Sequence, residues 1–369
     1  MKRGNGEGTI CRRKDGLYTA ALMVDGRRKW VYGKTEREVR LKLLALQNLA
    51  ARSGNLPQPG KRTVSDLLDA WLEAVAPTLK PSTLESYRKV ANAYILPLIG
   101  KVRLNRLTPD VVQRLITPLQ QQGKARTATK VYAALHRACR VAVLWGWLAN
   151  NPCERILRPQ YRAERREMWA KDDLQRFLEG AQGHPLYPLY LLLVATGMRL
   201  GEALALRWSD VDWAAGTVQV ERSVQRIRGE WVFGSPKSKS SIRSVTLPSE
   251  VLATLKQHRL HQLKELGAGW SPEGLVFCNR AGEVLCQSVV QHNLQRLCER
   301  LGLPPLTPHG LRHLHASLLL SEGLPIPLVS RRLGHANAAV TMGIYAHCVS
   351  KRDDQAVQAI SKALTGGAR

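Results

Sequence analysis

The stretch ATGMRLGE, residues 195–202, follows a strongly apolar run that begins near Leu189. Gly197 ends the predicted apolar helix, and the guanidinium of Arg199 follows at the break. A planar guanidinium binds a phosphate through two parallel hydrogen bonds, which the ammonium of a lysine cannot do. This stretch therefore predicts a helical domain that presents an arginine to a phosphate-bearing ligand.

Further motifs in the C-terminal half carry the groups that chemistry at a phosphodiester needs. Such a displacement requires a nucleophile, a proton donor for the leaving oxygen and cations around the non-bridging oxygens. In HGLRH, residues 309–313, a spacing of three places His309 and Arg312 on one helical face. The runs LGH, residues 333–335, and TMGIYAH, residues 341–347, follow.

These motifs resemble those of the tyrosine recombinase, or phage integrase, family. Its C-terminal domain shows, in this order, an arginine, a lysine, His-x-x-Arg, a later histidine within Leu-Gly-His, and a nucleophilic tyrosine. The resemblance implies that Arg199 and Arg312 hold the scissile phosphate and that His309 and His335 complete the cradle. It also implies that Tyr345 is the nucleophile.

The proton donor is expected in PKSKSSIR, residues 236–243, at the turn into a predicted strand. Similar family hairpins carry the lysine that protonates the leaving 5′ oxygen, and this resemblance favours Lys237 over Lys239. The alternative for a turn rich in Lys and Ser is plain contact with the DNA backbone. Glu202, three residues after Arg199, resembles the family's acidic residue that supports the first arginine.

The implied reaction is a transesterification. The tyrosine attacks a phosphodiester, leaving a 3′-phosphotyrosyl link and a free 5′ hydroxyl, and a hydroxyl of another strand reverses the step. Because the link keeps the bond energy, no cofactor or metal ion is required. The sequence departs from the commonest family pattern at Gly310, where Asp is frequent, and at Leu314 and Ser238, where Thr is frequent, but none of these changes removes a catalytic group.

Residues 1–61 are rich in Lys and Arg and are predicted to form a small domain with its linker. Strands are expected at residues 8–12, 17–24 and 28–32. Thr35 and Glu38 have the capping-box spacing that opens a helix. Trp30 and Tyr32, among basic residues, are candidates for stacking on DNA bases, but in an amphipathic sheet aromatic residues more often pack on the following helix, and that packing is expected here. The unit resembles the arm-binding domain of larger integrases.

The remaining chain completes an α+β fold that is mainly helical. Residues 62–155 resemble the family's four-helix core-binding domain, with helix starts at Ser65, Pro81, Thr108 and near Thr127. Residues 156–369 are the predicted catalytic domain, opened by a basic linker. Its predicted helices include 249–265, 288–301 and 309–321, and its one short antiparallel sheet has strands at 217–223, 227–233 and 241–247.

Charge and apolar content limit the classes of partner. The chain has 55 Lys and Arg against 29 Asp and Glu, a net charge of +26, which favours nucleic acid or an anionic membrane. The longest apolar run is about half of the roughly 20 residues that a membrane span needs. Seven cysteines without a Cys-x-x-Cys pair indicate neither a disulfide framework nor a zinc ribbon, so a cytoplasmic protein is predicted.

The resemblance implies the partners. The expected substrate is double-stranded DNA with attachment sites, and the expected synaptic complex is a homotetramer. DNA-bending and directionality proteins are candidate further partners. The attachment-site sequence, and an origin in a phage, a transposon or another integrative element, are not specified by the sequence.

Other functions fit parts of the sequence. Asp210 and Asp212 resemble the carboxylate pair of a metal-dependent nuclease, but they lie in a predicted helix-to-strand turn, where caps are the commoner role. His313, His315 and His347 lack the Cys or carboxylate partners of a zinc site, which favours packing or hydrogen bonding to phosphate.

Two related classes of protein are weighed against an integrase. A type IB topoisomerase shares the chemistry without a partner duplex, but the extra basic N-terminal domain favours an integrase of a mobile element. A DNA-binding regulator that has lost catalysis predicts gaps in the site. All six positions are filled here: Arg199, Lys237, His309, Arg312, His335 and Tyr345.

Overall fold

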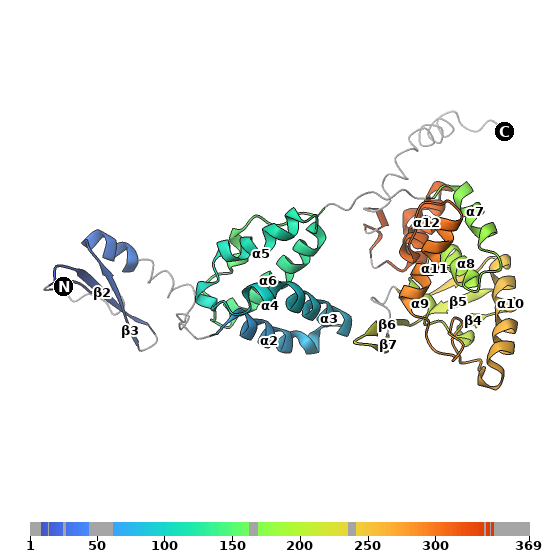
Figure 1. Cartoon of the computed structure of the whole chain (residues 1–369), viewed down its shortest axis with the longest axis horizontal. Helices are drawn as coiled ribbons and strands as arrows, with labels where there is room; N and C mark the ends of the chain where they lie inside the picture. The colour runs from blue at the N-terminus through green and yellow to red at the C-terminus, as the bar shows by residue number, and fades with distance from the viewer. Residues whose placement is uncertain are drawn as a thin grey trace, which may run out of the picture. The chain divides into compact units, whose positions relative to one another are not determined.

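The computed structural model divides the chain into two compact units, residues 1–164 and residues 165–369. The fold is α+β and mainly helical, with small antiparallel sheets, as the sequence predicts (Figure 1). Among the described helices, none combines the length and the apolar content needed to cross a membrane. The structure describes residues 9–13, 15–24, 27–43, 62–161, 169–234, 241–335, 337–339 and 341–342.

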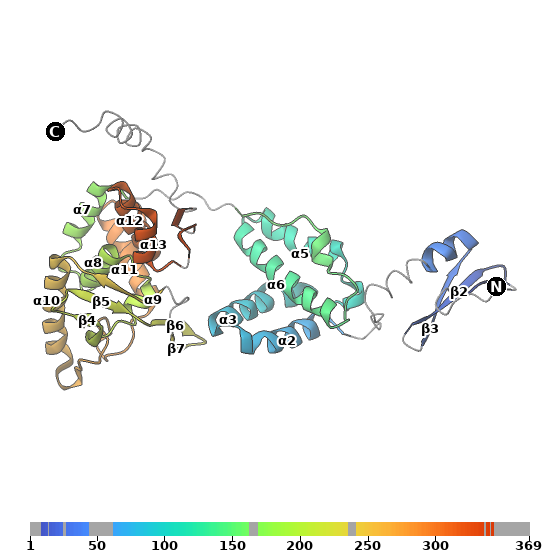
Figure 2. The ribbon, with the colours of Figure 1, turned by 180° about the vertical axis from the view of Figure 1, so that it is seen from behind.

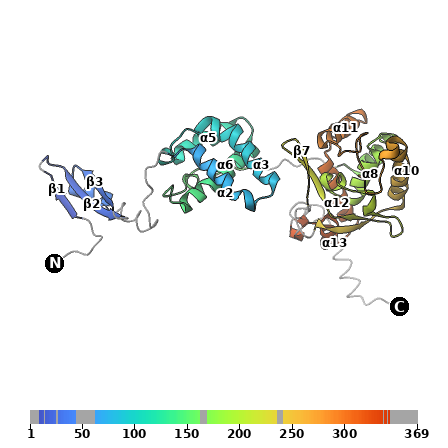
Figure 3. The ribbon, with the colours of Figure 1, turned by 90° about the horizontal axis from the view of Figure 1, so that it is seen from below.

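The N-terminal part of the first unit is a three-stranded antiparallel sheet in the order β1-β2-β3 (Figure 3). Its strands are β1 (Thr9–Arg12), β2 (Tyr18–Val24) and β3 (Arg27–Gly33). A helix then covers residues 36–43. Thr35 accepts a hydrogen bond from the backbone of Glu38, whose carboxylate accepts one from the backbone of Lys34. The predicted strands and the helix start are confirmed.

The two faces of this sheet differ. Ala20 and Leu22 pack against Val39 and Leu43 of the helix. Because side chains alternate along a strand, the face that holds Trp30 and Tyr32 lies on the other side of the sheet. The two rings are 50% and 47% exposed. The expectation that they pack on the helix is wrong, since β3 turns Val31 toward the helix instead.

Four helical segments with their own apolar core make up residues 62–155, and their predicted starts are confirmed within three residues (Figure 1). Thr63 and Thr108 cap two of them through their hydroxyl groups. The helices are α2 (Val64–Val75), α3 (Pro81–Val90), which continues through a π-helical turn (Ala91–Ile95) into α4 (Leu96–Ile99), α5 (Pro109–Gln121) and α6 (Ala125–Leu144). Short 3-10 turns cover Ala76–Thr78, Leu104–Arg106 and Pro152–Arg155.

Residues just after this helical core still contact it. The backbone N–H of Leu157 donates to the side chain of Gln113. Arg158 lies over the ring of Tyr132, at 5.9 Å from its centre. The segment predicted as a basic linker therefore begins as a packed extension of these helices.

The second unit is built around α8, a helix of almost wholly apolar sequence that contacts both α12 and α10 (Figures 1 and 3). Figure 2 shows the same unit from behind, with α13 beside α12. Its helices are α7 (Lys171–Gly180), α8 (Tyr187–Thr196), α9 (Leu200–Ala203), α10 (Ser249–Leu266), α11 (Gln287–Arg300), α12 (Pro308–Ser321) and α13 (Ile326–Leu333). The three predicted helices α10, α11 and α12 are confirmed.

The described strands of this unit form two small sheets rather than one. The first has the order β4-β5-β8 and the second is the hairpin β6-β7. The strand predicted at residues 227–233 is observed as β7, but it begins only at Glu230, because the chain turns at Arg228 and Gly229, both with positive φ. The strands are β4 (Val211–Asp212), β5 (Thr217–Val220), β6 (Ser223–Ile227), β7 (Glu230–Gly234) and β8 (Arg243–Thr246).

Candidate active site

Two helices of the second unit end at glycines in the left-handed conformation. Gly197 ends α8 with a φ of 63°, and Gly334 ends α13 with a φ of 68°. A Cβ on Gly197 would lie 2.6 Å from the ring of His315, so the position is also too crowded for a side chain. After Gly334, the N–H of His335 donates to Ser330, which completes a Schellman cap and orients the histidine.

Arg312 ties these two helix ends together. Its guanidinium donates to the carbonyl of Gly197 at 2.6 Å and to that of Leu333 at 2.7 Å. The last carbonyls of a helix lack intrahelical partners and carry partial negative charge, so they stabilise a buried cation. Arg312, in the first turns of α12, is only 2% exposed.

Arg199 opens α9 directly after the break and is held by Glu202. The Glu202 carboxylate accepts one hydrogen bond from the Arg199 backbone at 3.0 Å and one from its guanidinium at 2.7 Å. The side chain of Arg199 is 29% exposed, whereas that of Glu202 is 1% exposed. Arg199 thus keeps surface for a ligand while its carboxylate partner is buried.

A second arginine, Arg243 at the start of β8, shares Glu202. Its guanidinium donates to the carboxylate at 3.0 Å, to the carbonyl of Arg332 at 2.7 Å and to that of Ser241 at 2.9 Å. Burial alone would raise the pKa of Glu202, but the charge of Arg243 and the hydrogen bonds and charge of Arg199 outweigh it and lower the pKa. Glu202 is therefore ionised between two arginines.

Arg199, Arg243 and Arg312 form a cluster of positive charge together with His335, which lies in their electrostatic field. Burial and the positive charges of Arg312 and Arg199, with smaller effects of His313 and Arg243, lower its pKa to about 4. A hydrogen bond of 2.8 Å joins its Nδ1 to the hydroxyl of Thr341. The ring is therefore neutral near pH 7 when no anion is bound.

His309 occupies the first turn of α12 and is exposed, while Arg312 lies one turn further on. Its ring contacts that of His313 edge to face, with centres 4.5 Å apart. Burial and the charge of Arg312 lower the pKa of His313. His309 thus borders the cluster through His313.

His315 has a structural role, in agreement with the packing alternative. Its Nδ1 lies 2.7 Å from the carbonyl of Val194, and Arg332 donates to its Nε2 at 3.3 Å. A carbonyl only accepts and a guanidinium only donates, so the ring is the neutral tautomer with its proton on Nδ1. Burial and the charge of Arg332 lower its pKa to about 4.

Asp210 and Asp212 lie at the turn into a strand, as the sequence predicts. Asp210 accepts from the backbone of Arg207 and from Arg222, and Asp212 accepts from two backbone N–H groups of the following turn, which confirms the cap and turn roles.

At Gly310, a Cβ would lie 2.7 Å from Leu306, which fills the space beside it. Lys237, Lys239, Ser238, Tyr345 and His347 lie outside the described residues, so their assignments stay predictions.

Sequence reasoning gave no role to Arg243, Arg332 or Thr341. The motif around Lys237 includes Arg243, but nothing local separates this arginine from the many other basic residues. What distinguishes Arg243 is its pairing with the buried carboxylate of Glu202. A buried carboxylate needs cations around it, but this pairing exists only in the folded chain.

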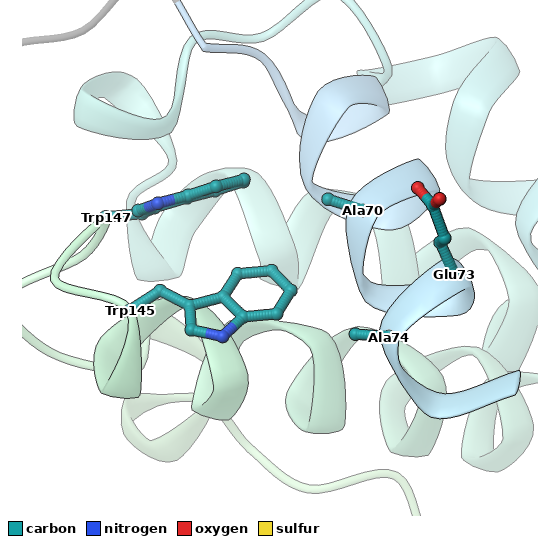
Figure 4. Close-up of a pocket in the computed structure, with 5 residues that line it drawn as sticks. All are labelled: Ala70, Glu73, Ala74, Trp145 and Trp147. Carbon is teal, nitrogen blue, oxygen red and sulfur yellow. The ribbon is translucent and has the colours of Figure 1, made fainter. Parts of the chain in front are cut away.

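A cavity of about 570 Å3 in the helical part of the first unit offers a different kind of site. Figure 4 shows Trp145 and Trp147 facing Ala70, Glu73 and Ala74 of α2. The charged group among its lining residues is the carboxylate of Glu73, which repels a phosphodiester. The arginine and histidine cluster of the second unit is the better candidate.

The chain matches two protein families along its length. Residues 169–352 match the phage integrase family, and residues 63–120 match the phage integrase N-terminal SAM-like domain. A tyrosine recombinase XerC-like protein of Caldanaerobacter subterraneus subsp. tengcongensis is 32% identical over 90% of this chain and 91% of the relative.

Solved structures agree with this match in fold. The Tn1549 transposon integrase, in complex with transposon right end DNA, aligns with 81% of this chain and all of its own at 18% identity, with a TM-score of 0.71. A lambda integrase tetramer bound to a Holliday junction aligns with 93% of this chain and 96% of its own, at 21% identity and a TM-score of 0.60. The chain therefore belongs to the phage integrase family and is a tyrosine-type site-specific recombinase, an enzyme that breaks and rejoins DNA.

Proposed function

We propose that the cluster around Arg199 and Arg312 binds the scissile phosphate of a DNA attachment site. The observation that carries this proposal is the joining of two capped helix ends by Arg312, beside Arg199 and His335. Guanidinium groups held in fixed positions stabilise the negative charge that builds up in the transition state, and they need no rearrangement during the reaction. His309 and His335 complete this cradle.

The chemical step follows from the nature of the nucleophile. The phenol of Tyr345 gives up its proton to solvent and its oxygen bonds to phosphorus, the bond to the 5′ oxygen breaks, and Lys237 donates a proton to that oxygen. A 3′-phosphotyrosyl link and a free 5′ hydroxyl result. A 5′ hydroxyl of a second strand then attacks the link, and Tyr345 is released. One phosphodiester replaces another, so the reaction uses neither ATP nor a metal ion.

Tyr345→Phe tests the nucleophile. This change removes the attacking oxygen with little loss of volume, so binding to a core site should persist while the covalent complex on a nicked suicide substrate disappears. Covalent complex that persists in the variant would refute the assignment. Cleavage that is lost in EDTA and restored by magnesium would refute the metal-free reaction.

Lys237→Ala tests the proton donor. Cleavage of ordinary DNA should slow sharply, whereas a substrate with a 5′-bridging sulfur should be cleaved well, because a thiolate leaves without protonation. Lys239→Ala is the matched control and should cleave ordinary DNA normally. Rescue by sulfur in the Lys239 variant alone would move the role to that residue.

We also propose a division of labour along the chain. Residues 1–61 would bind arm-type DNA sequences, residues 62–155 the core site, and residues 156–369 would carry out the chemistry. The separate apolar cores of the first two segments support this division. Strand exchange needs two sites, so the active assembly would be a homotetramer on two duplexes, with DNA-bending and directionality proteins as further partners. Its place would be the cytoplasm, on the nucleoid.

A further inference from the structure

Arg243 lies at a junction of three segments that the proposed mechanism uses. Its guanidinium reaches the carboxylate of Glu202 in α9, the carbonyl of Arg332 in α13 and the carbonyl of Ser241 beside its own strand. The side chain is 6% exposed. A buried cation with three acceptors on three segments fixes their spacing, because moving any one segment breaks a charged hydrogen bond.

On one side, this junction leads to Arg199. Glu202 uses one carboxylate oxygen for the guanidinium of Arg199, and the other for Arg243 and the backbone of Arg199. The carboxylate therefore cannot turn toward one arginine without weakening its bond to the other. The position of the Arg199 guanidinium is thus linked to that of Arg243.

On the other side, the junction leads to His335. Arg243 holds the carbonyl of Arg332 in the last turn of α13, and the hydroxyl of Ser241 donates to the carbonyl of Gly334 at 3.3 Å. A Cβ on Gly334 would lie 2.9 Å from the Arg243 guanidinium, so the glycine lets the two segments approach. His335 is the next residue in the chain.

We propose that Arg243 is a positioning residue for DNA cleavage, which holds Arg199, through Glu202, and the end of α13 that carries His335 in one arrangement. It acts on the substrate only through these groups. The inference rests on the proposed function of the cluster, since it assumes that Arg199 and His335 act on the scissile phosphate.

The geometry requires an arginine. A lysine ammonium retains the charge and can pair with Glu202, but its single nitrogen cannot span acceptors on both α9 and α13 as the planar guanidinium does. The Arg243→Lys variant should therefore keep much of the stability of the fold but lose the alignment of Arg199 with the end of α13. The Arg243→Met variant should lose both the stability and the alignment, because it leaves the buried carboxylate of Glu202 with one cation fewer.

Arg222 provides a matched control. It also pairs with a buried carboxylate, donating to both oxygens of Asp210 at 3.0 and 2.9 Å. Neither residue contacts the cluster through any hydrogen bond that the described residues show. Arg222→Met should therefore lower the melting temperature without changing the rate of cleavage.

The experiment compares three quantities in the full-length protein and its variants: the single-turnover rate of covalent complex formation at saturating nicked core DNA, the Kd for that DNA, and the melting temperature. Arg243→Met and Arg243→Lys should each cleave about 100-fold more slowly, the effect expected of a small misplacement of a reacting group. Their Kd should change by only a few-fold. The proposal would be overturned if the folded Arg243→Lys variant cleaved at the wild-type rate. It would also be overturned if Arg222→Met slowed cleavage as much as Arg243→Met does.

A double variant tests the link through Glu202. If Arg243 acts on Arg199 through this carboxylate, Arg243→Met should slow Glu202→Gln much less than it slows the wild type. Fully multiplicative effects would overturn the proposal. Tyr345→Phe separates the two hypotheses: covalent complex in that variant refutes the proposed function, whereas its loss together with fast cleavage by Arg243→Lys refutes only the role of Arg243.

Discussion

The N-terminal sheet and the cluster of the second unit are both rich in arginine, but they hold it differently. On the sheet, Arg28 and Arg13 lie over the exposed rings of Trp30 and Tyr32, at 5.5 and 6.0 Å. In the cluster, Arg312 is buried and donates to fixed carbonyls.

The difference shows what each arrangement suits. Exposed arginines on aromatic rings keep their freedom to adjust, and they attract a polyanion mainly through charge. Buried arginines with fixed acceptors cannot adjust, and this rigidity is what stabilises a transition state. The comparison predicts that changes in the sheet alter binding, whereas changes in the cluster alter chemistry.

The largest expected effect comes from deleting residues 1–61. Recombination between full attachment sites should be lost, because the tethered second contact that raises effective concentration is gone. Cleavage of an isolated core site should continue at the wild-type rate. The isolated fragment should bind duplex DNA with a steep salt dependence. If the shortened enzyme recombined full sites at the normal rate, the predicted difference between the sheet, which serves binding, and the cluster, which serves chemistry, would be contradicted.

The next largest effect separates two Arg-to-Lys changes. Arg312→Lys should slow cleavage by roughly 100- to 1,000-fold, as expected when a preorganised donor is removed from a transition state. A lysine cannot bond both helix ends and a phosphate together. Arg28→Lys should cleave core DNA at the wild-type rate, because its charge is exposed and replaceable. Single-turnover cleavage of one core substrate measures both, and similar rates would contradict the comparison.

Acid should weaken the second unit before it weakens the sheet. The pKa values of His315 and His335 are about 4, below the ordinary 6.5 of an unfolded histidine. Between these values the unfolded chain binds more protons, so stability falls as pH drops from about 6.5 toward 4. Melting of the chain lacking residues 1–61, followed over this range, should show the fall.

The N-terminal fragment is the control for this titration, since residues 1–61 contain no histidine. A hydrogen bond from Lys42 lowers the pKa of Glu38. The stability that this ionised carboxylate adds is fully present above the ordinary carboxylate pKa, and it is lost only as the pH falls through the lowered pKa. The fragment should therefore melt at nearly the same temperature at pH 6.5 and pH 5. A parallel fall in both would point to a cause other than the two histidines.

The smallest effect is expected on the exposed face of the sheet. Trp30→Ala should change the free energy of unfolding by less than about 0.5 kcal/mol, because the ring contributes little to the core. Leu22→Ala, on the buried face, should destabilise by about 2 kcal/mol or more. Urea denaturation of the N-terminal fragment measures both, and DNA binding by the Trp30 variant should weaken although its stability is unchanged.

The sequence by itself determined the local features. Alternating and helical apolar patterns predicted most strands and helices, and Gly197 marked the end of an apolar helix, because a left-handed residue that ends a helix is a requirement of the local backbone. The ordered motifs also indicated the family. The assignments of Lys237 and Tyr345 still rest on that order alone.

Only the tertiary structure decided which charges are paired. Arg312 bonds a carbonyl 115 residues away, and Arg243 bonds a carboxylate 41 residues away. It also decided that Trp30 faces away from the helix and that the chain turns at Arg228. Local sequence patterns reflect contacts between near neighbours, whereas among 55 Lys and Arg residues the buried ones are selected by packing across the whole domain.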